Sequence, residues 1–166
     1  MNSGGTTNSS SRKNSVARGA TVLALGLAAI LLAYAGTTRP VGADAKPTKT
    51  TQDGVYTEDQ AKQGKAQYSQ SCASCHMDDL SGSGQALPLV GDAFTQTWEG
   101  QTVDDLFELI RTTMPQDKPG NLTPEQTLNV VAFLLQSNQF PAGKDELKSD
   151  PDALKNILIT TKKSGN

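Results

Sequence analysis

The sequence predicts an all-α domain of three to four main helices, and three observations lead to this prediction. Three segments begin with a threonine of the kind that caps helix N-termini, at Thr57, Thr102 and Thr123. After the last two, apolar residues recur three and four positions apart, which is the spacing of one helix face. No stretch alternates apolar and polar residues as a half-buried strand does, and the chain has no internal repeat.

The first helix is predicted to begin after Thr57 and to end near Gln70. Thr57-Glu58-Asp59-Gln60 has the pattern of a capping box with acidic residues in the first turn. Gly64 in the interior of a helix costs about 1 kcal/mol relative to alanine. We therefore expect another helix to cross closely at Gly64, with Tyr68 one turn further along the same face, rather than a tolerated surface glycine.

The second helix is predicted from Thr102 to about Thr113, with Asp104 and Asp105 in its first turn. It should stop there because Met114 precedes a proline, and the residue before proline avoids the helical conformation. Its apolar face is expected to contain Leu106, Leu109 and Ile110.

The third helix is predicted from the sequence Thr123-Pro124-Glu125-Gln126, which supplies an N-cap, a proline at the first helical position and a closing glutamine. It should end near Ser137-Asn138. A loop is expected over Phe140–Lys148, and Asp150-Pro151 should begin a short helical turn or an extended wrap.

Residues 57–160 form the predicted domain. Residues 46–56, which are polar and contain proline and glycine, are predicted to be a linker, and residues 161–166 a flexible tail.

Residues 1–45 are predicted to be a signal peptide. A basic N-terminal stretch without acidic residues precedes Ala20–Ala35, an uninterrupted run of apolar and small residues. That run is short for a membrane span, which needs about 20 residues, but it suits a secretory signal followed by cleavage at Ala43-Asp44-Ala45. The alternative is an uncleaved membrane anchor.

The charge of the remaining chain excludes nucleic-acid binding as a function class. Residues 46–166 contain 11 Lys and Arg against 16 Asp and Glu, which gives a formal charge of −5. There is no basic patch with interleaved aromatic residues. An acidic body predicts partners whose contact surface is basic rather than acidic.

Every cysteine and histidine of the chain lies within Cys72-Ala73-Ser74-Cys75-His76. C-x-x-C-H is the attachment pattern of a c-type haem. Two thiols three positions apart can each bond one vinyl group of the same porphyrin, and the adjacent histidine then reaches the iron from one face. The sequence therefore predicts one covalent haem c. It would fill the centre of a small domain that has few aromatic residues of its own.

Other interpretations of the cysteine pair are weaker. A thiol–disulfide oxidoreductase of the thioredoxin type expects a βαβ pattern around the motif, and a structural zinc site expects four nitrogen or sulfur ligands where only three exist. A disulfide between Cys72 and Cys75 would close too small a loop to stabilise much. A haem sensor with a labile sixth ligand is a further alternative.

Several further motifs surround the haem pattern: Gly64–Tyr68, Leu87–Gly91, Phe94 with Trp98, Asp105–Phe107, Thr113–Pro115, Pro119–Leu122 and Val131–Leu134. Through them the chain from Val55 to about Ile159 resembles the class I cytochrome c family. It is most similar to the cytochrome c domains associated with quinoprotein alcohol dehydrogenases and related periplasmic oxidoreductases. The resemblance implies an exported electron carrier of a respiratory chain rather than an enzyme in its own right. A dehydrogenase would be the donor, and an oxidase or another cytochrome the acceptor. A membrane-anchored subunit of such a complex is the alternative.

His76 is the predicted proximal iron ligand through its position in the motif. Met1 is lost with the leader, and Met77 adjoins His76, so its sulfur cannot easily reach the opposite face of the ring. Elimination and the family pattern together predict Met114 as the second axial ligand. A core-filling role for Met114, ligation by a lysine or asparagine, and an open sixth site remain alternatives.

Other residues are assigned to the haem environment by the resemblance alone. It implies that the carbonyl of Pro88 accepts a hydrogen bond from His76. Tyr68, Phe94 and Trp98 match positions that pack in the core or against the haem edge. For Trp98, an indole hydrogen bond to a haem propionate and simple packing both remain open.

Overall fold

A computed structural model describes residues 46–84 and 86–162 of the chain. The elements follow in the order β1 (Lys49–Thr50), η1 (Thr51–Asp53), α2 (Glu58–Ser71), α3 (Ala73–His76), α4 (Asp92–Trp98), α5 (Val103–Thr113), α6 (Pro124–Ser137), α7 (Pro151–Lys155) and β2 (Ile157–Leu158). The predicted all-α class is confirmed. The predicted signal peptide and residues 163–166 of the predicted tail lie outside the described residues. Within the described part, no helix has the length and apolar character that crossing a membrane requires.

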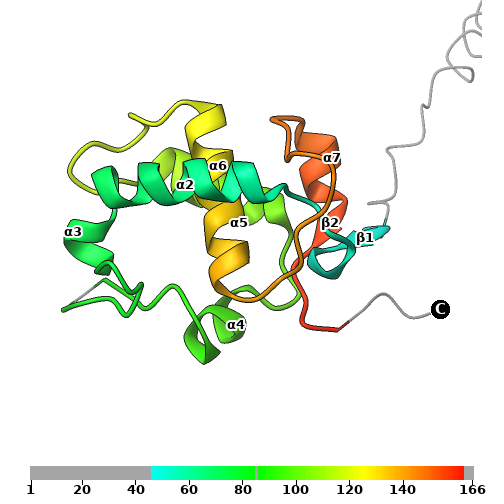
Figure 1. The fold of residues 1–166 in the computed structure, drawn as a ribbon, viewed down its shortest axis with the longest axis horizontal. Helices are drawn as coiled ribbons and strands as arrows, with labels where there is room; N and C mark the ends of the chain where they lie inside the picture. The colour runs from blue at the N-terminus through cyan, green and yellow to red at the C-terminus, as the bar shows by residue number, and fades with distance from the viewer. Residues whose placement is uncertain (1–45, 85, 163–166) are drawn as a thin grey trace, which may run out of the picture. The chain divides into compact units, whose positions relative to one another are not determined.

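Helices α2 and α6 cross in close contact at Gly64 (Figure 1). A Cβ atom on Gly64 would lie 1.7 Å from the carbonyl oxygen of Asn129 and 2.9 Å from the Cβ of Phe133. One turn further along α2, the ring of Tyr68 packs on the ring of Phe133 with their centroids 5.2 Å apart. The expected close approach of a helix at Gly64 is therefore confirmed.

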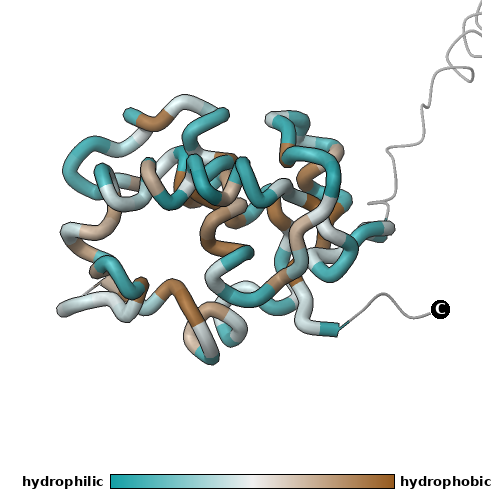
Figure 2. The backbone as a smooth tube through the Cα atoms, in the orientation of Figure 1, coloured by the Kyte–Doolittle hydropathy of each residue, from teal (hydrophilic) through white to brown (hydrophobic). Residues whose placement is uncertain are grey.

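Helices α5 and α6 contribute far more to the apolar core than α2 does, with 11 of the 23 buried apolar residues of the described chain against two. Figure 2 shows α2 as largely hydrophilic along its length, whereas α6 is among the most hydrophobic parts of the tube. The buried residues of α5 are Val103, Asp104, Leu106, Phe107 and Ile110. Leu109, which was expected on the apolar face, is 45 % exposed, so that part of the prediction was wrong. The buried stripe is centred between Leu106 and Phe107, and Leu109 lies to its side.

The helix ends follow local signals, with one exception at α2. Helices α5 and α6 begin after Thr102 and Thr123 as predicted, and α5 ends at Thr113, ahead of Pro115. The predicted capping box forms at Thr123, and Thr102 also has a complete box that was not predicted. At α2 only half of the expected capping box forms. The Thr57 hydroxyl accepts a hydrogen bond from the Gln60 backbone N–H, but the Gln60 side chain does not bond back to Thr57. The Gln60 side chain instead bonds both backbone groups of Leu147, at 2.9 and 3.0 Å.

The segment that was predicted to be a linker is part of the domain. Strand β1 pairs in parallel with β2, with Lys49 opposite Ile157. The buried Thr51 accepts a hydrogen bond from the Thr160 N–H (3.1 Å) and donates one to the Thr160 carbonyl (3.2 Å). The polar side chains of this segment therefore hold the C-terminal strand. Composition could not reveal this, because the partners are 109 residues apart.

Candidate haem site

The predicted attachment motif lies on the short helix α3, at the opposite end of the domain from β1 and β2 (Figure 1). The backbone N–H of Cys72 donates to the Tyr68 carbonyl (2.8 Å) and so closes α2, and the next residue begins α3. Cys72 is half-buried, Cys75 is exposed, and the two thiols form no disulfide. Both thiols are therefore available for bonding to a haem, and they lie within one helical turn of each other.

One hydrogen bond orients the ring of His76. Its Nδ1 lies 2.9 Å from the carbonyl oxygen of Leu87. Because a carbonyl only accepts, Nδ1 carries the proton and donates, which leaves the lone pair of Nε2 for a metal. The resemblance had implied Pro88 as the acceptor, and this was wrong by one residue. The backbone bond from Leu89 N–H to the Leu80 carbonyl (2.8 Å) sets which carbonyl of the loop faces the ring.

The loop that supplies this carbonyl is tied to α6 by Asn138. Its amide nitrogen donates to the Leu89 carbonyl (2.9 Å), and its amide oxygen accepts from the Gly91 N–H (2.9 Å). The sequence analysis missed this positioning residue. An asparagine at the end of a helix is a common cap, and only the fold brings it to a loop 47 residues earlier in the chain.

Tyr68 lies in the core beneath the motif. Its hydroxyl donates to the Met77 carbonyl (2.7 Å), which follows His76 directly. Burial, followed by the nearby Cys72, Asp78 and Asp79, raises the pKa of Tyr68 to about 12. The hydroxyl therefore stays protonated and can donate throughout the physiological range.

The structure places the other predicted site residues at the ends of helices. Met114 is the C-cap of α5, is half-buried and packs against the core. Trp98 ends α4 and is 8 % exposed, with its ring centroid 6.4 Å from that of Phe94. Ligation by Met114 and a haem-edge role for Trp98 stay predictions.

The donor set fits a c-type haem better than the alternatives. Cys72, Cys75 and His76 are three donors where a structural zinc site has four. Among residues 46–84 and 86–162, no group of three or more His, Cys, Asp or Glu is arranged to hold a metal ion. Burial, and then the neighbouring Cys75, raise the pKa of the Cys72 thiol to about 11. A reactive C-x-x-C cysteine needs a lowered pKa, so thiol–disulfide chemistry is disfavoured.

The surroundings of the motif also suit a large, flat, apolar group. Ala73, Leu89 and Val90 are half-buried and pack against the core. Leu87 is 68 % exposed next to the histidine that its carbonyl binds. Exposed apolar surface beside two thiols and an oriented imidazole is the environment that a covalently attached porphyrin requires.

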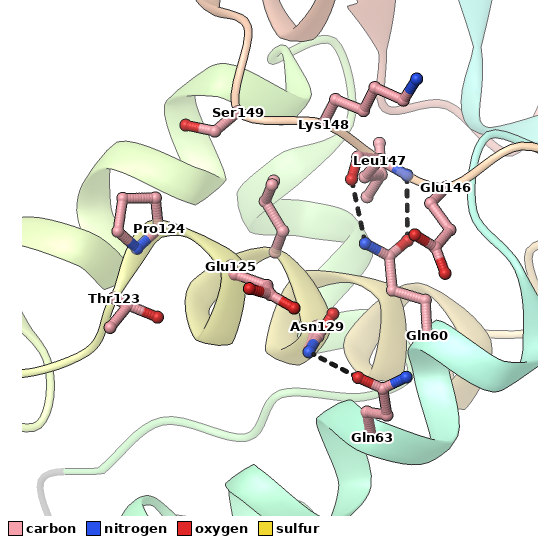
Figure 3. A pocket seen from close by; sticks show the side chains of 11 residues that line it. Gln60, Gln63, Thr123, Pro124, Glu125, Asn129, Glu146, Leu147, Lys148 and Ser149 are labelled. Atoms are coloured by element: carbon pink, nitrogen blue, oxygen red, sulfur yellow. Dashed lines mark hydrogen bonds between the residues drawn. The ribbon is translucent and has the colours of Figure 1, made fainter.

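A groove of about 540 Å³ lies elsewhere, between α2, the first turn of α6 and residues 146–149 (Figure 3). Its amide side chains already have partners, since Gln60 bonds the Leu147 backbone and Asn129 donates to Gln63 (3.2 Å). No residue of the haem motif lines it. The groove is therefore separate from the candidate site.

Residues 59–134 match the family described as cytochrome C oxidase, cbb3-type, subunit III. The matched span contains Cys72–His76, the Leu87 loop and Met114. The matched residues form a class I c-type cytochrome domain. Membership of this family implies haem c as the cofactor of the cytochrome and electron transfer as its role.

Among solved structures, the cytochrome is similar to the sulfane dehydrogenase SoxCD from Paracoccus pantotrophus. The two chains are 21 % identical with a TM-score of 0.43, over 73 % of this chain and 68 % of that one. No curated protein matches the cytochrome.

Proposed function

We propose that this cytochrome is an exported carrier of single electrons, with one haem c bonded to Cys72 and Cys75 and ligated by His76 and Met114. The observation that best supports the proposal is the hydrogen bond from His76 Nδ1 to the Leu87 carbonyl. It fixes the ring and its tautomer on the same helical turn that carries both thiols. When bound, the haem supplies a couple between ferrous and ferric iron.

The residues of the chain hold and tune that couple. The Leu87 carbonyl makes the His76 imidazole a more basic ligand, and a thioether from Met114 raises the reduction potential relative to more electron-rich ligands. If His76 and Met114 both hold the iron, no substrate would need to bind it. Leu89 and Val90, which are half-buried and pack against the core, would help to exclude water from a bound haem. Electrons would then reach and leave the iron without any covalent bond being made or broken.

Dehydrogenases are the donors that we propose, with an oxidase or another cytochrome of a respiratory chain as acceptor. The matched family, whose description names a subunit of a cytochrome oxidase, is compatible with such an acceptor. We propose that residues 1–45 direct export and are removed, so that the carrier is periplasmic. The same apolar run would instead tether the cytochrome if it were a subunit of a membrane complex.

One preparation tests these assignments. The intact mass of the exported protein should equal residues 46–166 plus one haem, and the pyridine haemochrome spectrum should show two thioether bonds.

In Met114→Ala, the haem should stay covalently bound while the weak sulfur-to-iron charge-transfer band disappears and imidazole binds readily. A band that survives this change would show that Met114 is not the ligand, and a retained leader would support the tethered alternative.

A further inference from the structure

The loop that carries the Leu87 carbonyl is held more by hydrogen bonds than by burial. None of the described residues between Leu80 and α4 is buried, and Leu87 itself is exposed. Besides the bonds of α4, three hydrogen bonds hold residues 88–91 of the described chain. One joins the Leu89 N–H to the Leu80 carbonyl, and Asn138 makes the other two. The position of this loop therefore depends largely on one side chain from α6.

Asn138 is itself firmly anchored in the scaffold. It is the C-cap of α6, and its backbone N–H bonds the carbonyls of the buried residues Leu134 (3.1 Å) and Leu135 (3.2 Å). Two residues later, the buried Phe140 packs on Phe94 of α4, with the ring centroids 6.4 Å apart. The end of α6 is therefore joined both to the loop and to the helix that follows the loop.

The two bonds from Asn138 to the loop require an amide side chain. The Leu89 carbonyl only accepts and the Gly91 N–H only donates, so the amide nitrogen must face the first and the amide oxygen the second. A carboxylate lacks the donor, and an aliphatic side chain lacks both groups. Leu87 lies two residues before Leu89, so a shift of this backbone would also move the oxygen that faces His76. A hydrogen bond weakens steeply when its distance and angle depart from their optimum.

We propose that Asn138 is a positioning residue that lowers the reduction potential of the iron by holding the Leu87 carbonyl on His76. The inference rests on the proposed electron-transfer function. A strong hydrogen bond from Nδ1 increases the electron density at Nε2, which makes His76 a more basic ligand and stabilises ferric over ferrous iron. When the two bonds from Asn138 to the loop are lost, the bond to His76 weakens and the ferrous state becomes relatively more stable. Asn138 therefore acts on the couple through the loop and not by contact with the histidine.

Spectroelectrochemical titration of the holoprotein tests this role with two variants. Asn138→Ala removes both bonds to the loop. Asn138→Ser has a shorter side chain, which can still bond the Leu134 carbonyl one turn back but cannot reach the loop. The second variant therefore separates the local cap of α6 from the connection to the loop.

The matched control is Asn156→Ala, at the opposite end of the domain from α3 (Figure 1). Asn156 is the C-cap of α7, and its amide also makes two bonds to a distant segment. It accepts from the Thr48 N–H and donates to the Thr48 hydroxyl, both at 2.8 Å. None of the three substitutions changes the net charge, so the position of the lost amide is what differs.

In both Asn138 variants the equilibrium constant for reduction should rise about tenfold, which is about 59 mV for one electron, and Asn156→Ala should keep the wild-type potential. The direction of the change is diagnostic. A domain that is merely loosened lets water reach the haem, which favours the more highly charged ferric state and lowers the potential. In the ferrous holoprotein, proton NMR should also show the Nδ1–H of His76 exchanging with solvent at least about tenfold faster in the Asn138 variants.

An unchanged or lower potential in either Asn138 variant would overturn the proposal, as would an equal rise in Asn156→Ala. If neither Asn138 variant retains haem although the wild type does, the bonds to the loop serve attachment and not the potential, which also overturns it. A wild type without covalent haem, or with a haem that does not cycle between ferric and ferrous iron, would instead overturn the proposed function.

Discussion

The α2–α6 crossing and the segment 72–91 are stabilised by different kinds of interaction. At the crossing, Gly64 lets α2 contact the backbone of α6, and the Tyr68 and Phe133 rings pack beside it. Among the described residues of the segment 72–91, only Leu80 is buried; a few half-buried apolar residues pack against the core, and the other contacts are backbone and side-chain hydrogen bonds. The comparison suggests a scaffold that folds from its own apolar contacts and a segment that is completed by the cofactor.

Removing both attachment thiols should produce the largest difference in local stability between the two regions. In Cys72→Ser with Cys75→Ser, the covalent haem is lost, and amide exchange in the described residues of 73–91 should accelerate by at least a factor of about 100, or roughly 3 kcal/mol of local stability. Exchange at the α2–α6 crossing should change far less. Hydrogen-exchange mass spectrometry measures both, with Ser74→Ala as the control that keeps the thiols. A uniform loss of protection would show that the scaffold also depends on the haem.

The substitution Gly64→Ala tests the α2–α6 crossing. Alanine normally stabilises a helix interior by about 1 kcal/mol relative to glycine. Here its Cβ would lie 1.7 Å from the Asn129 carbonyl oxygen, so the helices must separate, and we expect a loss of about 3 kcal/mol. Urea unfolding gives the value. Lys65→Ala, at an exposed neighbouring position, is the control. A gain in stability would show that the helices do not meet at Gly64.

The scaffold was the more predictable region because its signals are local. Threonine caps, the proline after Met114 and a glycine in the middle of a helix act within a few residues of themselves. Helix α4 was missed because its N-cap, Gly91, has a φ of 69° and makes no side-chain cap bond. The spacing of Phe94 and Trp98, one helical turn apart, was a signal that could have found it.

The site was predictable only where its residues are neighbours in sequence. Two thiols and one imidazole within five positions identify the cofactor chemistry by themselves. The Leu87 carbonyl contributes through its backbone position, and Asn138 contributes because the fold brings the end of α6 close to the loop. Neither contribution can be recognised from the amino-acid composition. The same holds for Thr51 and Thr160, whose hydrogen bonds turn an apparent linker into part of the domain.

A pair of tyrosines can sharpen the comparison further. Tyr68→Phe keeps the ring on Phe133 but removes the hydrogen bond to the Met77 carbonyl, and it should cost about 1 kcal/mol. Tyr56→Phe, whose hydroxyl donates to the Phe140 carbonyl (2.6 Å), is the matched control with a similar cost. Only Tyr68→Phe should speed exchange at the Leu80 amide, which bonds the same carbonyl. Equal exchange at Leu80 in both variants would count against a role for Tyr68 in shaping the segment.

The smallest expected effect lies on the side of the scaffold, at Glu99. Its carboxylate accepts hydrogen bonds from the Thr160 hydroxyl and the Thr161 N–H, and these bonds lower the pKa of Glu99. A carboxyl whose pKa is lower in the folded state stabilises above its unfolded pKa, and this contribution disappears as the pH falls through the folded value. Because Glu99 is exposed, Glu99→Gln should cost less than about 1 kcal/mol at pH 7. Urea unfolding between pH 7 and pH 3 should show the difference from wild type shrinking with acid, while exchange in residues 73–84 stays unchanged. A difference that is constant over this range would mean that the charge of Glu99 does not hold the C-terminal strand.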